Sequence, residues 1–486
     1  MSNQNHNTSV EEQYGSFPVP LKDRTWGPWL AAAVCATAAI ATWSLVVGGF
    51  TASYVGAQAG TSTMVAGALI VQMLVSLSQL PPNTKHGLET VVTTKPQLGV
   101  RGSYIALIIQ FAVLTGWNLV LMIFFGRSVA AVLVSAGWIA EASSGTTALV
   151  ASVGGALLVW ALLTVGSKAL RYLAPAIAIM VVGIAIWMLF VLFGAYPLSE
   201  IAAAPPLAPT EGGPLMNYTL ALEVMMVSTM GWWAYMGGML RMVSSASKAA
   251  MPSMASLGFG WAAVGLISLY SALVTGKWDP TVWMIDLGGP AAGAVVLAFI
   301  ALANIGSTLV GVHAATLGVG QVPFLSERIR SWGLMAGIVI IPMIVVLILF
   351  PGPFYDNIGI FLAFVGILIA PVMGVQIVDW FVFNRDDHMH IPSLYRHNST
   401  SEYWYTNGFN VAGIVGLIAG GAVYVAFLNP YTFVPRIEAF QYVTATLPAT
   451  LTGGLVYWGL SVALAPRGSV PAVRTAAGRY SRATRS

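Results

Sequence analysis

One apolar stretch of the chain carries polar or small residues at spacings of three and four, namely Asn304, Ser307, Thr308 and Gly311. In an α-helix this spacing puts them on one face. Two hydroxyls and an amide offer hard oxygen ligands, which suit Na⁺. The same groups could instead hydrogen-bond to neighbouring helices and serve packing alone. The spacing therefore leaves a cation site and a packing seam as alternatives.

Two ionisable residues lie in otherwise apolar stretches. His313 is the one histidine in such a stretch, and it could be a satisfied core residue, bind a polar ligand or carry a proton. Glu223 is the one carboxylate well inside such a stretch. Burying an unpaired carboxylate is costly, so Glu223 should be paired, protonated or facing a watery cavity. A coupling-proton role and a structural pairing near a helix end both remain open.

Small residues and aromatics mark two further stretches. Residues 36–49 and 228–238 both end in a Gly-Gly pair and are rich in small residues, which permits unwound backbone whose carbonyls can bind a cation. Discontinuous helices at corresponding places in two halves of a chain typically form a transporter site. Trp117, Trp232 and Trp233 lie in mid-stretch, whereas tryptophan normally prefers membrane interfaces. Each could stack on a planar ligand or simply pack.

The composition defines the class that must position these residues. The chain has 486 residues, of which 57% are hydrophobic and 8% charged, against about 25% charged in soluble proteins. Long runs are almost free of charge and approach the roughly 20 residues that span a bilayer; they are residues 148–165, 172–192, 291–310, 334–349 and 358–378. Polar and apolar residues do not alternate in them, which excludes a β-barrel. The sequence predicts a polytopic all-α membrane protein.

The basic residues predict the topology. Twelve apolar segments are centred near residues 40, 70, 115, 156, 182, 228, 264, 303, 341, 368, 419 and 455. Of the 21 Lys and Arg residues, only Arg127, Lys277 and Arg436 fall on one side of this arrangement. The positive-inside rule then puts both termini in the cytoplasm, and we expect a multi-pass protein of the plasma (inner) membrane. The N-terminus lacks the features of a cleaved secretory signal.

Several other classes of protein are disfavoured. No basic stripe with interleaved aromatics suggests nucleic-acid binding. Cys35 is the single cysteine, so an internal disulfide and a cysteine-based metal site are excluded. His388, His390 and His397 share a polar stretch without metal-ligand spacing, and we expect a solvated cytosolic loop. An enzyme is not expected because no catalytic motif appears, and a channel is not expected because no repeated filter motif appears.

Several short motifs resemble one family of transporters. They are Arg24-Thr25-Trp26-Gly27, Gly99-Val100-Arg101-Gly102-Ser103, Gly116-Trp117, Pro371-Val372-Met373-Gly374, Ile377-Val378-Asp379-Trp380 and Asn384-Arg385. Their order and spacing resemble the nucleobase–cation symporter family, which includes cytosine, allantoin and hydantoin permeases. The resemblance runs from about Pro18 to Arg385.

The resemblance implies an inverted five-plus-five helix repeat with broken first and sixth helices and two additional C-terminal helices. The implied divisions are a cytosolic N-terminal tail (1–25), a first repeat (26–195), a second repeat (196–383), a cytosolic loop with the last two helices (384–466), and a basic cytosolic tail (467–486). We expect a monomer in the lipid bilayer, without a cofactor other than Na⁺ as coupling ion.

The resemblance also implies two ligand sites. Thr37 and Ile40 would offer backbone carbonyls to Na⁺, with Asn304, Ser307 and Thr308 completing the site. A planar heterocycle would lie between Trp117 and an aromatic residue of the sixth helix. Counting back from Arg241 puts Ser228-Thr229 at that stacking position, whereas the Gly-Trp motif puts Trp233 there, and the chemistry of stacking favours Trp233.

The expected substrate contacts depart from the family pattern. Ala41 and His313 occupy positions that usually carry polar substrate contacts, and Ala41 has no polar side chain to offer. Leu114 and Leu121 flank Trp117 where relatives often place Gln. The sequence therefore predicts a cation-coupled importer of a nucleobase, hydantoin or related heterocycle that works by alternating access, with Na⁺ as the favoured ion. The alternative is a transporter of the same architecture that couples an amino acid or amine to H⁺ through Glu223 or His313.

Overall fold

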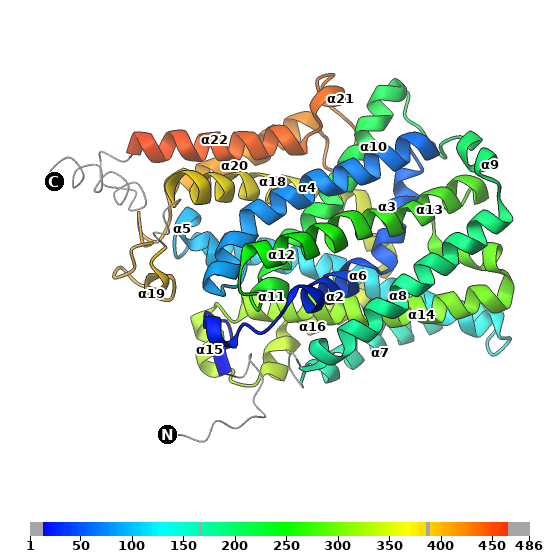
Figure 1. Cartoon of the computed structure of the whole chain (residues 1–486), viewed down its shortest axis with the longest axis horizontal. Coiled ribbons are helices and arrows are strands. Elements are labelled where there is room, and N and C mark those ends of the chain that lie inside the picture. The colour runs from blue at the N-terminus through cyan, green and yellow to red at the C-terminus, as the bar shows by residue number, and fades with distance from the viewer. Residues whose placement is uncertain (1–12, 165–167, 385–388, 465–486) are drawn as a thin grey trace.

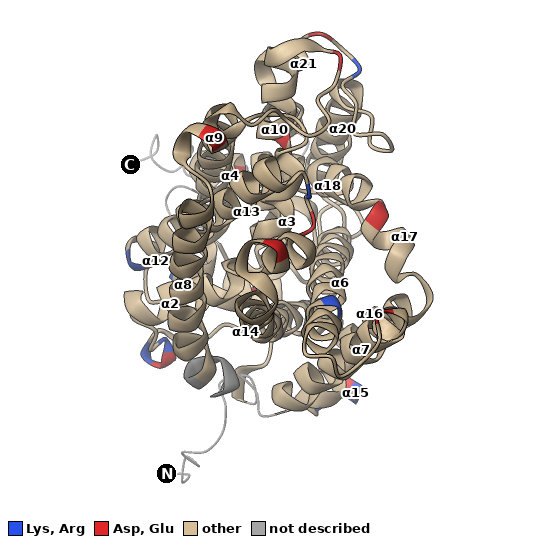
Figure 2. Cartoon of the chain, turned by 90° about the vertical axis from the view of Figure 1, so that its right-hand side faces the viewer, with Lys and Arg blue, Asp and Glu red and all other residues tan. Residues whose placement is uncertain are grey.

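The computed structural model describes residues 13–164, 168–384 and 389–464, and these residues form helices joined by loops (Figure 1). Within these ranges the extended backbone amounts to three isolated bridges, without a sheet. The basic tail at 467–486, the first twelve residues, Arg385 and His388 lie outside the described residues. Lys, Arg, Asp and Glu colour only short stretches of the ribbon in Figure 2, as the low charge content predicts.

The long helices follow the predicted segments. They are α4 (Ala57–His86), α6 (Ser103–Ser135), α7 (Ser144–Leu163), α8 (Lys168–Ala195), α10 (Gly213–Met230), α13 (Trp261–Thr275), α14 (Pro280–Val319), α16 (Trp332–Leu349), α18 (Ile358–Val378), α20 (Val411–Phe427) and α22 (Thr446–Leu464). In the described ranges, nine helical spans are long and apolar enough to cross a membrane, or ten with the bent pair α2 and α3. The all-helical class is confirmed, and the count of twelve stays a prediction.

The first span is broken, as the small residues predict. Helix α2 (Pro28–Ala39) ends before Ile40 and Ala41, and α3 (Thr42–Thr51) begins after them with its axis turned by 57°. Ala41 is fully extended, with φ −149° and ψ −175°. The last carbonyls of α2 therefore have no next turn of helix to satisfy them, and they need partners from elsewhere.

The sixth span changes its winding where the sequence reads Gly231-Trp232-Trp233-Ala234. Helix α10 ends at Met230, a 3₁₀ turn follows over Gly231–Ala234, and α11 (Met236–Leu240) continues the span. A Cβ at Gly231 would lie 2.5 Å from Nε1 of Trp117. Glycine at this position therefore allows the sixth span to approach α6 closely.

Helix α14 is the central element. Its first turns are set apart by Gly289, whose φ of 70° is readily adopted only by glycine. Beyond the following Pro290 it runs to Val319, and residues 303–319 are all buried. Its neighbours include α6, α8, α16 and α2. The polar face predicted from the spacing at Asn304 to Gly311 therefore lies inside the bundle.

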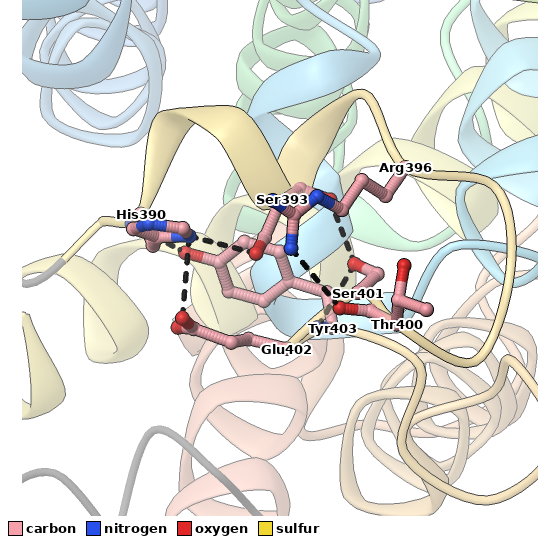
Figure 3. Close-up of polar contacts among 7 residues, drawn as sticks. All are labelled: His390, Ser393, Arg396, Thr400, Ser401, Glu402 and Tyr403. Atoms are coloured by element: carbon pink, nitrogen blue, oxygen red, sulfur yellow. Dashed lines mark hydrogen bonds and ion pairs between the residues drawn. The ribbon is translucent and has the colours of Figure 1, made fainter.

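The polar stretch after α18 forms a folded loop. The His390 ring nitrogen Nδ1 lies 2.7 Å from Ser393 Oγ and 3.2 Å from Glu402 (Figure 3). Ser401 Oγ donates to the Ser393 carbonyl, and Tyr403 Oη accepts from the His390 amide (Figure 3). Among the described residues no group of three His, Cys, Asp or Glu is arranged to hold a metal. The expected loop is present, and its described residues are held together by hydrogen bonds within the loop itself.

This loop covers a buried lysine. Lys95, in the short helix α5 (Lys95–Leu98), donates from Nζ to the Leu394 carbonyl at 2.6 Å and lies 5.4 Å from the Tyr395 ring centre. Burial lowers the pKa of Lys95 to about 8, and the nearby Glu89 carboxylate partly opposes this shift. The folded protein therefore releases this proton at lower pH than the unfolded chain does.

We predict that stability rises with pH between about 8 and 10.5 because of Lys95. In this window the unfolded chain binds more protons than the folded protein, so the free energy of unfolding increases with pH. A shift from 10.5 to about 8 corresponds to roughly 3–3.5 kcal/mol. Lys95→Met should remove the rise, which thermal unfolding of the purified protein across this pH range measures. Parallel curves for the wild type and Lys95→Met would contradict the assignment.

Candidate functional site

The open carbonyls at the end of α2 meet the predicted polar face of α14. Ser307 Oγ donates to the Thr37 carbonyl at 2.7 Å and lies 3.1 Å from the Ala38 carbonyl. All three residues are buried. The structure thus brings Thr37 and Ser307 together, as predicted, and adds the Ala38 carbonyl, which the sequence did not single out. Ile40 lies at the break itself.

Asn304 joins the same face to the start of α3. Its Oδ1 accepts from the Thr42 backbone N–H at 3.1 Å and from Thr42 Oγ1 at 2.9 Å. It therefore satisfies one of the free N–H groups that every helix start leaves. One turn further along α14, Thr308 Oγ1 is buried without a hydrogen-bond partner in the described part of the chain.

These groups form one oxygen-rich face, which we call the α2–α14 face and define as the Thr37 and Ala38 carbonyls with Asn304, Ser307 and Thr308. The carbonyl end of a helix carries a partial negative charge. Hydroxyl and carbonyl oxygens are hard ligands that favour cations from the s block over soft transition metals. The face therefore offers chemistry that suits a small hard cation.

An aromatic cluster lies beside the break. Trp43, the second residue of α3, contacts four other rings nearly edge-on, with centroid distances of 5.0 Å to Trp232, 5.4 Å to Trp117, and 5.8 Å to both Tyr235 and Trp261. The five rings, with Ser228 and Gly231, line a small pocket. Trp43 Nε1 also donates to the Ala39 carbonyl at 3.0 Å, so the cluster is tied directly to the end of α2.

The structure corrects the expected register of the sixth span. Trp232 faces this cluster, whereas Trp233 Nε1 donates to Gln376 on α18 at 2.6 Å. Thr229, the other candidate, donates back to the Met225 carbonyl of its own helix. Trp233 and Thr229 do not line the pocket, whereas Ser228, which was predicted together with Thr229, does. Both tryptophans lie in the 3₁₀ turn at Gly231–Ala234, where three residues per turn put consecutive side chains about 120° apart, so the two rings face different neighbours.

Two more expected substrate contacts lie away from the pocket. His313 packs against Trp332 at the start of α16, with ring centroids 5.3 Å apart. It is five residues beyond Thr308, or about 7.5 Å along the helix axis. Ala41 lies in the extended break, next to Thr42. Trp43 and Trp261 contact Trp117 instead, and the sequence reasoning did not select them. Their position in the middle of a span, unusual for tryptophan, was the one feature of the sequence that could have indicated them.

Glu223 is paired to the last long helix. Its carboxylate accepts from Thr446 Oγ1 at 2.8 Å and from the backbone N–H groups of Ala445 and Thr446 at 3.2 and 3.3 Å. These donors lie at the start of α22, where backbone N–H groups lack partners within the helix. The contacts favour the structural pairing of Glu223 over a coupling-proton role.

The two ends of α14 carry further contacts. At its start, Asp279 accepts from Arg127 of α6 at 3.0 Å, and the guanidinium lies 4.2 Å from the centre of the Tyr355 ring. At its other end, Ser16 Oγ donates to the Leu317 carbonyl at 2.7 Å, and the Ser16 carbonyl accepts from Gln321. The Arg127–Asp279 ion pair therefore holds the start of α14, and the N-terminal segment at Ser16 is hydrogen-bonded to its C-terminal end.

A bundle of apolar helices with a broken first span beside a buried oxygen-rich face is the architecture of an integral-membrane transport protein. Comparison with known families agrees: residues 18–445 match the model described as a permease for cytosine/purines, uracil, thiamine and allantoin. The chain belongs to this family of membrane permeases, which confirms the resemblance seen in its motifs.

Individual relatives are distant. A stretch of 95 residues is 30% identical to the purine-uracil permease NCS1 of Arabidopsis thaliana, and it covers 19% of this chain and 16% of that protein. The chain therefore aligns with about a sixth of the length of this curated relative.

Solved structures share the fold across nearly the whole chain. Mhp1, a nucleobase-cation-symport-1 family transporter solved in a closed conformation with bromovinylhydantoin bound, matches with a TM-score of 0.74 at 16% identity, over 92% of this chain and 95% of Mhp1. The inward-facing conformation of Mhp1 gives a TM-score of 0.73 at 15% identity, over 92% and 94% of the two chains. A Na⁺-coupled sialic acid symporter gives 0.59 at 10% identity, over 90% of each chain.

We predict that Glu223→Ala lowers stability without changing the pH dependence of uptake. The substitution leaves the buried donors at the start of α22 unpaired, which costs about 1–3 kcal/mol for each group. Thermal unfolding and uptake at several pH values measure the two effects. Glu223→Gln, which keeps an acceptor oxygen, should be milder in stability. A loss of pH dependence in a variant that folds and inserts normally would restore the coupling-proton role.

Proposed function

We propose that this permease imports a planar heterocycle, such as a nucleobase, hydantoin or related compound, together with Na⁺. The observation that carries the proposal is the α2–α14 face, where the carbonyls at the end of α2 meet the hydroxyls of α14. The aromatic cluster lies beside this face, because Trp43 donates to the carbonyl of Ala39, the residue after Ala38. The family supports the substrate class, and the described contacts of Glu223 give a coupling-proton role for this residue no support.

In this proposal Na⁺ binds at the α2–α14 face through the Thr37 carbonyl and the side chains of Asn304, Ser307 and Thr308, and the Ile40 carbonyl at the break completes the site. The Ser307 hydroxyl now donates to a carbonyl, so it would turn its proton away when its oxygen binds the ion. Na⁺ would thus replace the hydrogen bond that joins α2 to α14, and would hold the two helices together through ligand bonds.

The substrate would stack on Trp117, with Trp232 as its partner on the sixth span. Trp43 touches both rings edge-on, so its indole would shift when a flat ligand enters between them. The ring nitrogens of Trp232 and Trp261 and the Tyr235 hydroxyl are buried without described hydrogen-bond partners. They would donate to the polar edge of the ligand, where the family's usual glutamines are replaced by Leu114 and Leu121.

Alternating access would proceed by exchanging the contacts at the two ends of α14. Release of Arg127 from Asp279 would open one side, and release of Ser16 from Leu317 and Gln321 would open the other. We assign the Arg127 side to the outside and both termini to the cytoplasm of the plasma (inner) membrane, since almost all Lys and Arg residues lie on the other side. Labelling of single cysteines from each side would measure this orientation.

The proposed architecture is a monomer of twelve spans, with inverted repeats at 26–195 and 196–383. Each of the twelve predicted segment centres falls within a helix or, for residue 40, at the break between two. Helix α20 has 17 residues, the lower end of the length that spans a bilayer, and such a short span is accommodated by local thinning of the bilayer.

We predict that Thr308→Ala raises the Na⁺ concentration needed for half-maximal substrate binding by about tenfold or more. The variant loses one of the oxygen ligands, and a tenfold change corresponds to about 1.4 kcal/mol of binding free energy. Thr316→Ala is the matched control, because its hydroxyl lies two turns away and donates to the Val312 carbonyl. Equal Na⁺ dependence in Thr308→Ala and the wild type would refute the cation site.

We predict that Trp117→Ala weakens heterocycle binding by roughly 5- to 150-fold, since stacking of a base on an aromatic ring contributes about 1–3 kcal/mol. Trp117→Phe keeps a ring and should lose less. Binding of radiolabelled nucleobases and hydantoins to purified protein measures both variants, and Trp233→Phe serves as a control for a tryptophan outside the pocket. Full affinity in Trp117→Ala would contradict the stacking role.

A further inference from the structure

The Asn118 side chain is buried without hydrogen bonds. Neither its Oδ1 nor its Nδ2 has a partner in the described part of the chain, and the residue is fully inaccessible to solvent. A carboxamide can accept two hydrogen bonds and donate two. Each buried polar group left unpaired costs about 1–3 kcal/mol, so such a group calls for a functional explanation.

Asn118 lies between the two candidate sites. It follows Trp117 on α6, and consecutive residues of a helix point about 100° apart. Trp117 faces the aromatic cluster, whereas Asn118 faces α14 at Gly311. A Cβ at Gly311 would lie 2.4 Å from Asn118 Oδ1 and 2.9 Å from Nδ2. Glycine at this position of α14 therefore makes the room that the amide occupies.

Gly311 belongs to the same face of α14 as the proposed Na⁺ ligands. It lies one turn beyond Ser307 and Thr308, at the spacings of three and four that keep residues on one side of a helix. Thr308 Oγ1, like the Asn118 amide, is buried without a described partner. Two unpaired oxygen-bearing groups, one from α6 and one from α14, thus lie at the same end of the α2–α14 face.

The other amide of α6 is already committed. Gln110 Nε2 donates to the Glu89 carboxylate at 3.0 Å and to the Ala234 carbonyl at 2.9 Å. The other buried positions around Trp117, Leu114 and Leu121, are apolar. Asn118 is therefore the amide of α6 with both polar atoms available to a ligand.

We propose that Asn118 is the positioning residue that couples the two substrates. Its carboxamide oxygen joins the Thr308 hydroxyl in holding Na⁺, and this contact fixes α6 so that the neighbouring Trp117 ring is placed for stacking. The inference rests on the proposed function, and it adds a physical link between the ion and the heterocycle. Because binding coupling is reciprocal, the heterocycle would strengthen Na⁺ binding by the same factor.

The experiment measures the affinity of purified protein for a heterocycle that it binds, in zero and in saturating Na⁺. The ratio of the two dissociation constants is the coupling factor. For Asn118→Leu we expect this factor to fall to below twofold, while the affinity without Na⁺ stays within about threefold of the wild type. Ser128→Ala is the control, because this buried hydroxyl of α6 also lacks a described partner but lies ten residues, or about 15 Å, away.

Two further variants separate coupling from folding. Gly311→Ala keeps asparagine at position 118 but puts a methyl group where its amide now lies. The amide must then turn away, and the coupling factor should fall as in Asn118→Leu. Asn118→Asp keeps an oxygen of the same reach and adds negative charge. It should keep the coupling factor and lower the half-saturating Na⁺ concentration.

The outcomes distinguish the inference from the proposed function. An unchanged coupling factor in both Asn118→Leu and Gly311→Ala, with normal coupling in the wild type, would overturn the role of Asn118 and leave Na⁺ symport standing. A loss of coupling in Ser128→Ala as large as in Asn118→Leu would also overturn it. A wild-type protein that binds heterocycles equally well with and without Na⁺ would overturn the proposed Na⁺ coupling, and the coupling role of Asn118 with it.

Discussion

The arrangement depends on the hydrogen bond between the Ser307 hydroxyl and the open carbonyl end of α2. Breaking a helix inside a membrane exposes carbonyls that neither water nor lipid can satisfy, so the protein itself must do so. Here Ser307 from α14 takes that role at Thr37, and Asn304 satisfies the first N–H group of α3 on the other side of the break. A site that holds polar backbone together in this way is also one where an ion can take over the same oxygens.

The break also explains the position of the aromatic cluster. Trp43 begins the second half of the first span, and its indole N–H donates to the Ala39 carbonyl at the end of the first half. The ring is thereby held among Trp117, Trp232, Tyr235 and Trp261. A movement at the end of α2 would consequently shift Trp43 through this one hydrogen bond. Because Trp43 contacts Trp117, and Gly231 lies close against Trp117, the same movement would also affect the sixth span.

The sequence predicted what depends on local pattern. Hydropathy located the helices, small residues located the break after α2, and the spacing of Asn304, Ser307 and Thr308 located one buried face. It failed where contacts between distant segments decide. Trp232 rather than Trp233 lines the pocket with Trp117, and the donors for Glu223 lie more than two hundred residues away. Asn118 was not singled out because its place depends on Gly311 of another helix, where the lack of a side chain makes room for the amide.

The distribution of charge bears on which cation the face can hold. The described carboxylates of the spans are engaged elsewhere: Glu223 at the start of α22, Asp286 with Lys277, and Asp379 with Gln97, Asn384 and Tyr457. The α2–α14 face then offers only neutral oxygens and the dipole of a helix end. Divalent ions are usually held by one or more carboxylates, whereas a monovalent ion is less costly to strip of water and needs no full countercharge. Neutral oxygens at a broken helix therefore suit a monovalent ion, such as the proposed Na⁺, better than a divalent one.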